Sequence, residues 1–130
     1  MERGRSYRLG DLQLEIMKLL WKRGASRVAD VRSELGSARF AYTTVATMLR
    51  KMEQRGLVRH HEEGRIFYYE PTVSAEEVTR NTTRDLVDRV FEGSLADAVS
   101  HLLDIRDVSP EELDRLERLI RERRKRHTSE

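Results

Sequence analysis

The chain has 130 residues, of which 38% are hydrophobic and 37% are charged, and its formal net charge is only +2. This length fits one domain, or a small domain with an appended one. No apolar stretch approaches the roughly 18 residues that a membrane-spanning helix needs, and the first residues, MERGRSYRLG, lack the apolar core of a secretory signal. These features predict a cytoplasmic, helix-rich protein with no membrane insertion.

The residues available for chemistry are few. Cys is absent, which excludes thiolate metal sites, Cys nucleophiles and disulfides. The four His residues form no HExxH or similar pair. No P-loop, GxGxxG, Ser/His/Asp grouping or paired-carboxylate signature is present. We therefore expect no metal, no cofactor and no enzymatic activity.

The charge is unevenly distributed along the chain. Residues 1–71 hold 14 basic and 9 acidic side chains, a balance of +5, whereas residues 72–120 hold 6 basic and 12 acidic ones, a balance of −6. Residues 121–126 then add five basic side chains. This order favours a front part that binds a polyanion, a middle with another role, and a basic end.

Two helices are predicted at the start of the chain. Leu12, Ile16 and Leu20 recur at helical spacing, and Gly24 follows as a helix stop, which indicates a helix over residues 11–23. Ser26 is a suitable N-cap for a second helix over residues 27–35.

A third helix is predicted over residues 42–55. One face carries the apolar residues Val45, Met48, Leu49 and Met52. The opposite face carries side chains that read base edges in a major groove, because Thr and Ala contact a thymine methyl, Arg binds guanine and Gln pairs with adenine. An ordinary solvated surface is the alternative. The candidate DNA-binding residues of this helix are Thr43, Thr44, Ala46, Thr47, Arg50, Lys51 and Gln54.

Two β-rich runs follow, over residues 57–61 and 66–69, with a turn at residues 62–65 in which Gly64 supplies a positive φ. Three helices followed by a two-stranded hairpin are the order of a winged helix-turn-helix, and the hairpin is the wing. Arg59 and Arg65 are the wing's candidate DNA-binding residues, and His60 and His61 are also placed to reach phosphates. Neighbours in a strand point to opposite faces, so the His pair does not indicate a metal site.

The sequence pattern of residues 72–130 predicts three further amphipathic helices. Their starts carry strong capping signals at Ser74 with Glu77, Ser94 with Asp97, and Ser109 with Pro110. Some 50 residues of this kind build too small a core alone, so a second copy is the expected partner surface.

The fold class is mainly α with a small β-hairpin wing: a DNA-binding domain at 1–71 and a helical dimerisation domain with a basic tail at 72–130. The candidate dimerisation residues are Val78, Leu86, Val90, Leu95, Val99, Leu102, Leu113, Leu116 and Ile120.

Four segments together resemble the penicillinase repressor (BlaI/MecI) family of bacterial transcription regulators. They are LGDLQLEIMKLLWKRG, AYTTVATMLRKMEQRGLV, EGRIFYYEPTVS and DVSPEELDRL, in collinear order across residues 9–120. The resemblance implies a homodimeric repressor with an N-terminal winged helix, which binds inverted repeats with TACA/TGTA-like half-sites. It also implies target genes such as those of β-lactamases or penicillin-binding proteins, although many members control other operons.

The resemblance also implies two ways in which repression can end, and this chain matches the two differently. A copper-responsive branch binds metal through C-terminal Cys pairs, and the absence of Cys excludes that branch. In the β-lactam-responsive branch a regulatory membrane protease cuts an Asn-Phe bond in the fifth helix. The matching positions here are His101 and Leu102, so the region of the cut is present but its two residues differ.

Two other functions stay open at this point. A winged helix can serve as a protein-interaction module, although such modules often carry an acidic or apolar third-helix face. A ligand-sensing regulator of another winged-helix family is the second alternative, and against it the chain has little apolar material for a ligand pocket.

Overall fold

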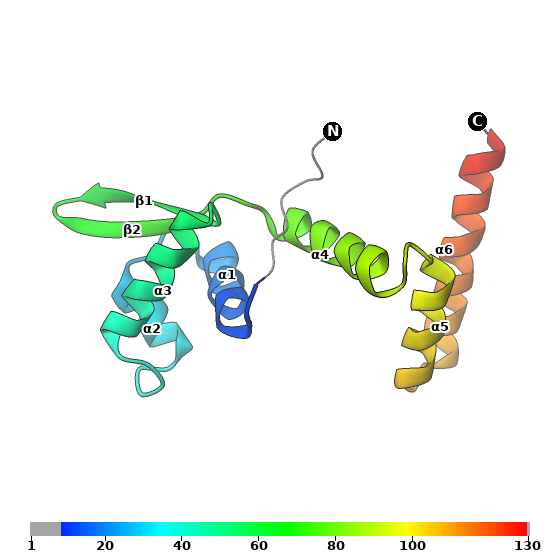
Figure 1. The fold of residues 1–130 in the computed structure, drawn as a ribbon, viewed down its shortest axis with the longest axis horizontal. Helices are drawn as coiled ribbons and strands as arrows, with labels where there is room; N and C mark the ends of the chain where they lie inside the picture. The colour runs from blue at the N-terminus through cyan, green and yellow to red at the C-terminus, as the bar shows by residue number, and fades with distance from the viewer. Residues whose placement is uncertain (1–8, 130) are drawn as a thin grey trace. The chain divides into compact units, whose positions relative to one another are not determined.

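A computed structural model describes residues 9–129; the first eight residues of the predicted DNA-binding domain and Glu130 of the basic tail lie outside the described residues. The protein is mainly helical with one β-hairpin after the third helix, as predicted (Figure 1). It divides into two compact units, one up to Leu86 and one from Val87. The boundary predicted at residue 71 separates two roles, DNA binding and dimerisation, and stays a prediction. The elements are α1 (Asp11–Arg23), α2 (Val28–Leu35), α3 (Tyr42–Gln54), β1 (Val58–Glu63), β2 (Ile66–Pro71), α4 (Ala75–Val90), α5 (Leu95–Ile105) and α6 (Pro110–Ser129).

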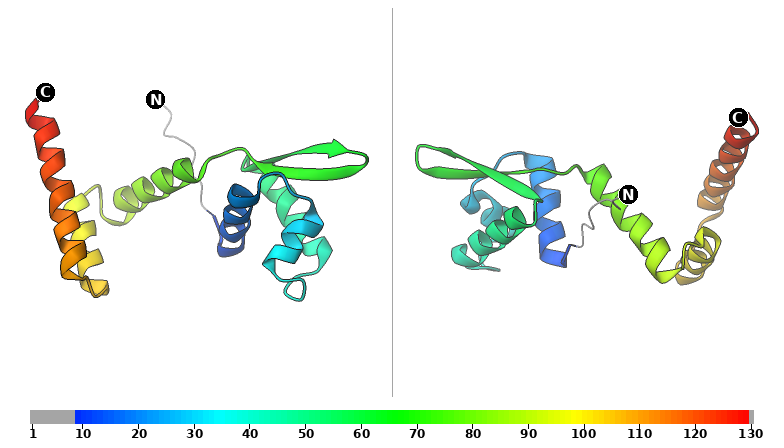
Figure 2. Two further views of the ribbon diagram at one scale, coloured as in Figure 1. Left: turned by 180° about the vertical axis from the view of Figure 1, so that it is seen from behind. Right: turned by 45° about the horizontal axis from the view of Figure 1, so that its top comes forward.

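The first unit closes around one hydrophobic core. The apolar faces of α1, α2 and α3 meet there, and Leu57, Val58 and Tyr69 of the hairpin region complete it. The most deeply buried helical residues are Ile16, Met17, Leu20, Val31, Val45, Leu49 and Met52. The hairpin extends past the three helices in every view (Figures 1 and 2). This unit therefore has the architecture of a winged helix.

The hairpin is longer than the sequence pattern predicts. Glu62 and Glu63, expected in the turn, belong to β1, and the register pairs Glu63 with Ile66. Only Gly64 and Arg65 remain between the strands, with φ of 54° and 69°. Two consecutive positive φ angles define a type I′ turn, whose twist matches that of paired strands. The prediction of a four-residue turn was wrong because it allowed one positive φ angle, on glycine, and not a second one on Arg65.

Ser26 has a different place from the one predicted. Helix α2 begins at Val28 with Arg27 as N-cap, so Ser26 does not cap it. Ser26 is fully buried, its backbone exchanges two hydrogen bonds with Tyr69 (2.9 and 2.8 Å), and its hydroxyl donates to the Gly24 carbonyl oxygen. This bridge joins the α1–α2 link to β2 and so attaches the wing to the helices.

The start of α4 is built into the first unit. Ser74 and Glu77 form the predicted capping box, with the Glu77 N–H donating to the Ser74 hydroxyl at 3.0 Å and the Ser74 N–H to the Glu77 carboxylate at 3.2 Å. Trp21 of α1 donates its indole N–H to the Val73 carbonyl oxygen at 2.8 Å. Val73 and Val78 are both buried in the core of this unit.

The second unit contains α5 and α6, which run side by side (Figures 1 and 2). The predicted caps are present: the Ser94 hydroxyl accepts the Asp97 N–H at 3.2 Å, and the Ser109 hydroxyl accepts the Glu112 N–H at 3.1 Å. Ala98 is the only residue of this unit that is buried among those described. Within residues 9–129, no helix has the length and apolar composition to cross a membrane.

Candidate nucleic-acid interface

The burial of Val45, Leu49 and Met52 decides which face of α3 meets solvent. Thr43, Thr44, Arg50, Lys51 and Gln54 are exposed, and Ala46 and Thr47 are half-buried beside them. The predicted residues therefore share one side of the helix. Arg50 donates to the Thr47 hydroxyl at 3.3 Å, so these two side chains lie together on that side.

Glu53 is the one acid of α3, and it is bound to the wing. The His60 N–H donates to the Glu53 carboxylate at 3.2 Å, and His60 Nδ1 lies 2.7 Å from Glu53 Oε1. This pair fixes β1 against the end of α3 and keeps the carboxylate partly occupied. Sequence reasoning missed this role, because a contact between residues seven apart across a turn has no periodic signature.

The wing presents two different faces. The ring of His60 stacks on Phe67 at 4.2 Å, whereas the ring of His61 stacks on Tyr68 at 5.5 Å. This agrees with the strand alternation. Among the described residues, no cluster of three or more His, Asp or Glu is arranged to hold a metal ion.

The two predicted wing arginines differ in their surroundings. Arg59 Nε lies 2.8 Å from Glu70 Oε1, its cross-strand neighbour, and so forms an ion pair within the wing. Arg65 occupies the turn, and no residue in the described range 9–129 pairs with its guanidinium. Arg65 is therefore the more available cation of the two.

Two hollows border the exposed face of α3. The first is lined by Thr43, Thr44, Thr47, Met48 and Lys51. The second lies between α2, α3 and the wing, and brings together the predicted residues Ala46, Arg50 and Arg65 with Arg27 and Tyr42, which the sequence did not single out. Gln54 and Arg59 line neither hollow.

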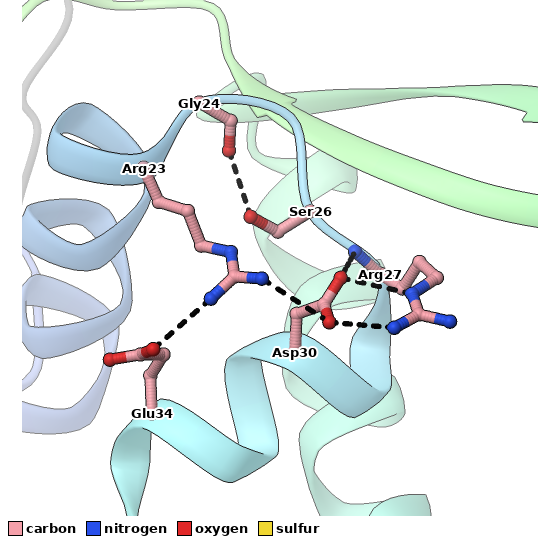
Figure 3. Close-up of polar contacts among 6 residues, drawn as sticks. All are labelled: Arg23, Gly24, Ser26, Arg27, Asp30 and Glu34. Atoms are coloured by element: carbon pink, nitrogen blue, oxygen red, sulfur yellow. Dashed lines mark hydrogen bonds and ion pairs between the residues drawn. The ribbon is translucent and has the colours of Figure 1, made fainter.

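An ionic cluster organises the start of α2 beside the second hollow (Figure 3). The Asp30 carboxylate accepts hydrogen bonds from the Arg27 N–H (3.0 Å), from Arg27 Nε (3.0 Å) and from Arg27 Nη2 (2.8 Å). These bonds lower the pKa of the Asp30 carboxyl to about 2. Arg23 lies 3.4 Å from the same carboxylate and also binds Glu34 at 3.1 Å. The cluster therefore holds Arg27 in a defined position.

Most of the predicted dimerisation residues are accessible. Leu86, Val90, Leu95, Leu102, Leu113 and Ile120 are exposed, and Val99 and Leu116 are half-buried. Val78 is different, because it is buried in the core of the first unit at 5% exposure. Val78 lies on the apolar stripe of α4, but it packs in the core of its own chain. It is therefore not part of the surface that a second copy could contact.

The predicted cleavage residues lie in the middle of α5. His101 and Leu102 are both exposed, and His101 Nδ1 lies 2.9 Å from the Asp97 carbonyl oxygen one turn earlier. The His101 ring also contacts the ring of Phe91 at 5.3 Å. The Leu102 side chain is 54% exposed in the single chain.

Comparison with known proteins gives a consistent result. The Penicillinase repressor family matches residues 9–122. The penicillinase repressor of Bacillus licheniformis is 29% identical over 91% of this chain and 93% of its own length. The transcriptional regulator BlaI of Mycobacterium tuberculosis is 31% identical over 88% of this chain and 84% of its own length.

A solved structure of a relative matches part of this chain. The solution structure of the monomeric form of Bacillus licheniformis BlaI in complex with the blaP half-operator is 31% identical, with a TM-score of 0.48, and covers 56% of this chain and 90% of that one. The family is described as a repressor and not as an enzyme, in agreement with the prediction from the sequence. The chain belongs to the penicillinase repressor family.

Proposed function

We propose that this protein is a homodimeric transcriptional repressor that binds an inverted-repeat operator and acts in the cytoplasm, where α3 of each copy enters a major groove. The observation that carries the proposal is the composition of the exposed side of α3. It presents Thr, Arg, Lys and Gln, while the helix's one acid, Glu53, is bound to His60 of the wing. Membership of a repressor family supports the same function.

Five side chains of this face have a matching base feature. Arg50 suits the two acceptors of guanine, and Gln54 suits the donor and acceptor of adenine. The methyl groups of Thr43, Thr47 and Ala46 suit the thymine methyl. Arg65 at the turn is suited to a phosphate, since such contacts set the register of a protein on the duplex without reading sequence.

The second copy is supported by the apolar surface of the second unit. Leu95 is 66% exposed, Ile120 is 56% exposed, and Ala98 alone is buried among the described residues of that unit. An apolar face of this extent favours burial against an equivalent face, and two linked copies read two half-sites. Residues 72–130 thus supply the dimerisation domain of the proposal.

The DNA-binding part is tested with operator DNA taken from upstream of the regulated gene and with scrambled DNA. We expect Arg50→Ala to reduce the discrimination between them by about 1–3 kcal/mol, because a lost base contact relaxes specificity. Thr47→Ala removes the hydroxyl that holds Arg50 and should act in the same direction.

The matched control is Lys18→Ala, which removes one exposed positive charge from α1 and lines neither hollow. It should leave the ratio of the two affinities unchanged. A ratio that stays at the wild-type value in Arg50→Ala and Thr47→Ala alike contradicts the placement of α3 in the groove.

Release of repression is proposed to be proteolytic, by a cut near His101 and Leu102 made by a regulatory membrane protease. The cut would separate α6 and the end of α5 from the DNA-binding half, and each half-dimer would lose the avidity of two linked half-sites. In the dimer, Leu102 would be covered by the partner, so the bond becomes accessible only when α5 opens locally.

Mass spectrometry of the protein from cells that express the regulated genes tests this release. Fragments ending at His101 are expected, with the intact chain dominant in repressed cells. Full-length protein that has left its operator contradicts the proposal and favours a small-molecule effector. The control is mass spectrometry of the protein from repressed cells, because a substitution such as Leu102→Pro would break α5.

A further inference from the structure

The hollow between α2, α3 and the wing gathers arginines from three separate elements. Arg27 comes from the start of α2, Arg50 from the middle of α3, and Arg65 from the turn of the hairpin. No Asp or Glu is among the residues that line it. All three arginines belong to the first unit, whose single core fixes their elements relative to one another.

Arg27 is held in position and still has donors to give. Its Nε and Nη2 are both used by Asp30, and Arg23 supports the same carboxylate from α1 (Figure 3). Within the described residues, no acceptor engages Nη1 of Arg27. A guanidinium restrained in this way loses little conformational entropy when it binds a further anion.

The rest of the lining is mostly apolar, and three of its large side chains are exposed. Tyr42 is 52% exposed, and Ile66 and Phe67 are each 42% exposed. Tyr69 also borders the hollow, and burial raises the pKa of its phenol. The hollow thus combines a cationic rim with an aromatic and aliphatic surface.

This combination matches the sugar–phosphate backbone of a nucleic acid better than it matches a small inorganic anion. The phosphates of a strand take the arginines, and the deoxyribose between two phosphates covers the apolar surface that a lone anion leaves exposed to water. The hollow also shares Ala46 and Arg50 with the exposed face of α3. A strand that borders the groove occupied by α3 therefore has to pass across it.

We propose that the DNA strand that borders the major groove lies in this hollow, and that Arg27 binds one of its phosphates. The inference rests on the proposed function. It adds a contact from α2 to the contacts from α3 and the wing, and it gives Asp30 the role of positioning Arg27.

The first test measures affinity for operator and scrambled DNA over a series of salt concentrations. Arg27→Gln should weaken binding to both DNAs alike, and the slope of log K against log salt should become shallower by about 1, as expected for one lost phosphate contact. The matched control is Arg23→Gln, which removes an arginine from the same Asp30 cluster but not from the hollow. Its slope should equal that of the wild type.

The second test locates the phosphate. Operator duplexes are made with one neutral methylphosphonate linkage at each position in turn. At one position, the neutral linkage should weaken DNA binding by the wild type and by Arg23→Gln. The same linkage should have no further effect on DNA binding by Arg27→Gln, because that variant already lacks the arginine charge that the phosphate would bind. Arg27→Lys keeps a charge without the fork to Asp30, so it should recover the salt slope even where Arg27→Gln melts at a lower temperature.

The outcomes separate the two proposals. In one outcome the wild type prefers its operator, but Arg27→Gln has the wild-type salt slope and responds to every neutral linkage as the wild type does. The DNA strand then does not lie in the hollow, and the proposed repressor function stands. If the wild type does not distinguish operator from scrambled DNA, the proposed function fails and this inference fails with it.

Discussion

The two units of this chain use similar amphipathic helices with opposite results. The first unit buries its apolar faces within the chain, so that Ile16, Leu20 and Leu49 are fully covered. The second leaves Leu95 66% exposed and Ile105 72% exposed. Helix α4 contains both situations, because Val78 near its start is 5% exposed and Val90 at its end is 64% exposed. An apolar stripe therefore predicts that a face will be covered, but not whether the chain itself or another chain covers it.

The largest test of this contrast removes the second unit. A chain ending at Leu86 keeps Val73 and Val78 and with them the whole core of the first unit. We expect a folded monomer whose operator affinity falls by about 10²–10⁴-fold, because the two half-sites are no longer read together. Sedimentation and DNA binding measure the two effects. A shortened chain that still sediments as a dimer would place the dimer contact in the first unit.

Replacing Val by Ala at a buried and at an exposed position of α4 tests the difference between the two units more closely. Val78→Ala should lower the free energy of unfolding of the first unit by about 2 kcal/mol, because it removes two buried methyl groups and leaves a cavity. Val90→Ala should leave that quantity nearly unchanged and instead weaken dimerisation. Thermal melting followed by circular dichroism measures the first effect, and sedimentation at several concentrations measures the second. Equal destabilisation by both variants would contradict the contrast.

Acid should act on the first unit through Asp30. Its carboxyl has a folded-state pKa of about 2, below the ordinary 3.8, so it stabilises the fold above about pH 4, and this contribution is lost as the pH falls from there to about 2. Asp30→Asn should therefore cost about 1 kcal/mol at neutral pH, after allowance for solvent screening, and much less near pH 2. Denaturant unfolding at both pH values measures this difference.

The control for Asp30→Asn is Glu34→Gln, which removes the other acid bound by Arg23. The side chain of Glu34 is 54% exposed, compared with 15% for Asp30. Its effect at neutral pH should be the smaller one. A penalty in Asp30→Asn that persists unchanged at pH 2 would show that the Asp30 carboxylate charge is not responsible.

The smallest expected effect concerns the turn of the wing. Arg65 has a φ of 69°, and Asn tolerates this left-handed conformation better than Arg does. Arg65→Asn should raise the free energy of unfolding by about 0.5 kcal/mol, and it should weaken binding to operator and scrambled DNA alike. Melting and salt-dependent DNA binding check the two signs. A gain in both stability and affinity would contradict the role of Arg65 in DNA binding.

Local signals in the sequence were sufficient for the helices. The caps at Ser74, Ser94 and Ser109 lie within three residues of their partners, and the structure contains each of the predicted bonds. The composition of the α3 face was equally predictable, because helical periodicity alone separates Arg50 from Leu49.

Contacts between distant segments were not predictable in the same way. Ser26 has the composition of a cap, but pairing with Tyr69 takes it into the core. Val78 follows the stripe of α4, yet the core of the first unit reaches it. Arg27 carries no motif, and only the packing of α2 beside α3 and the wing brings it to the same hollow as Arg50 and Arg65. These placements depend on tertiary packing, for which a single sequence has no periodic signal.

The bond between Trp21 and Val73 has a consequence for spectroscopy. Trp21 is the only tryptophan of the chain, and no tyrosine follows Leu86. Its indole is half-buried and hydrogen-bonded within the first unit, so ultraviolet fluorescence reports the unfolding of that unit. The second unit has Phe91 as its only aromatic ring besides histidine, and it contributes almost no signal above 280 nm. Loss of the partner chain or a cut after His101 should therefore leave the emission unchanged, so unfolding of the first unit can be followed by itself without any added label.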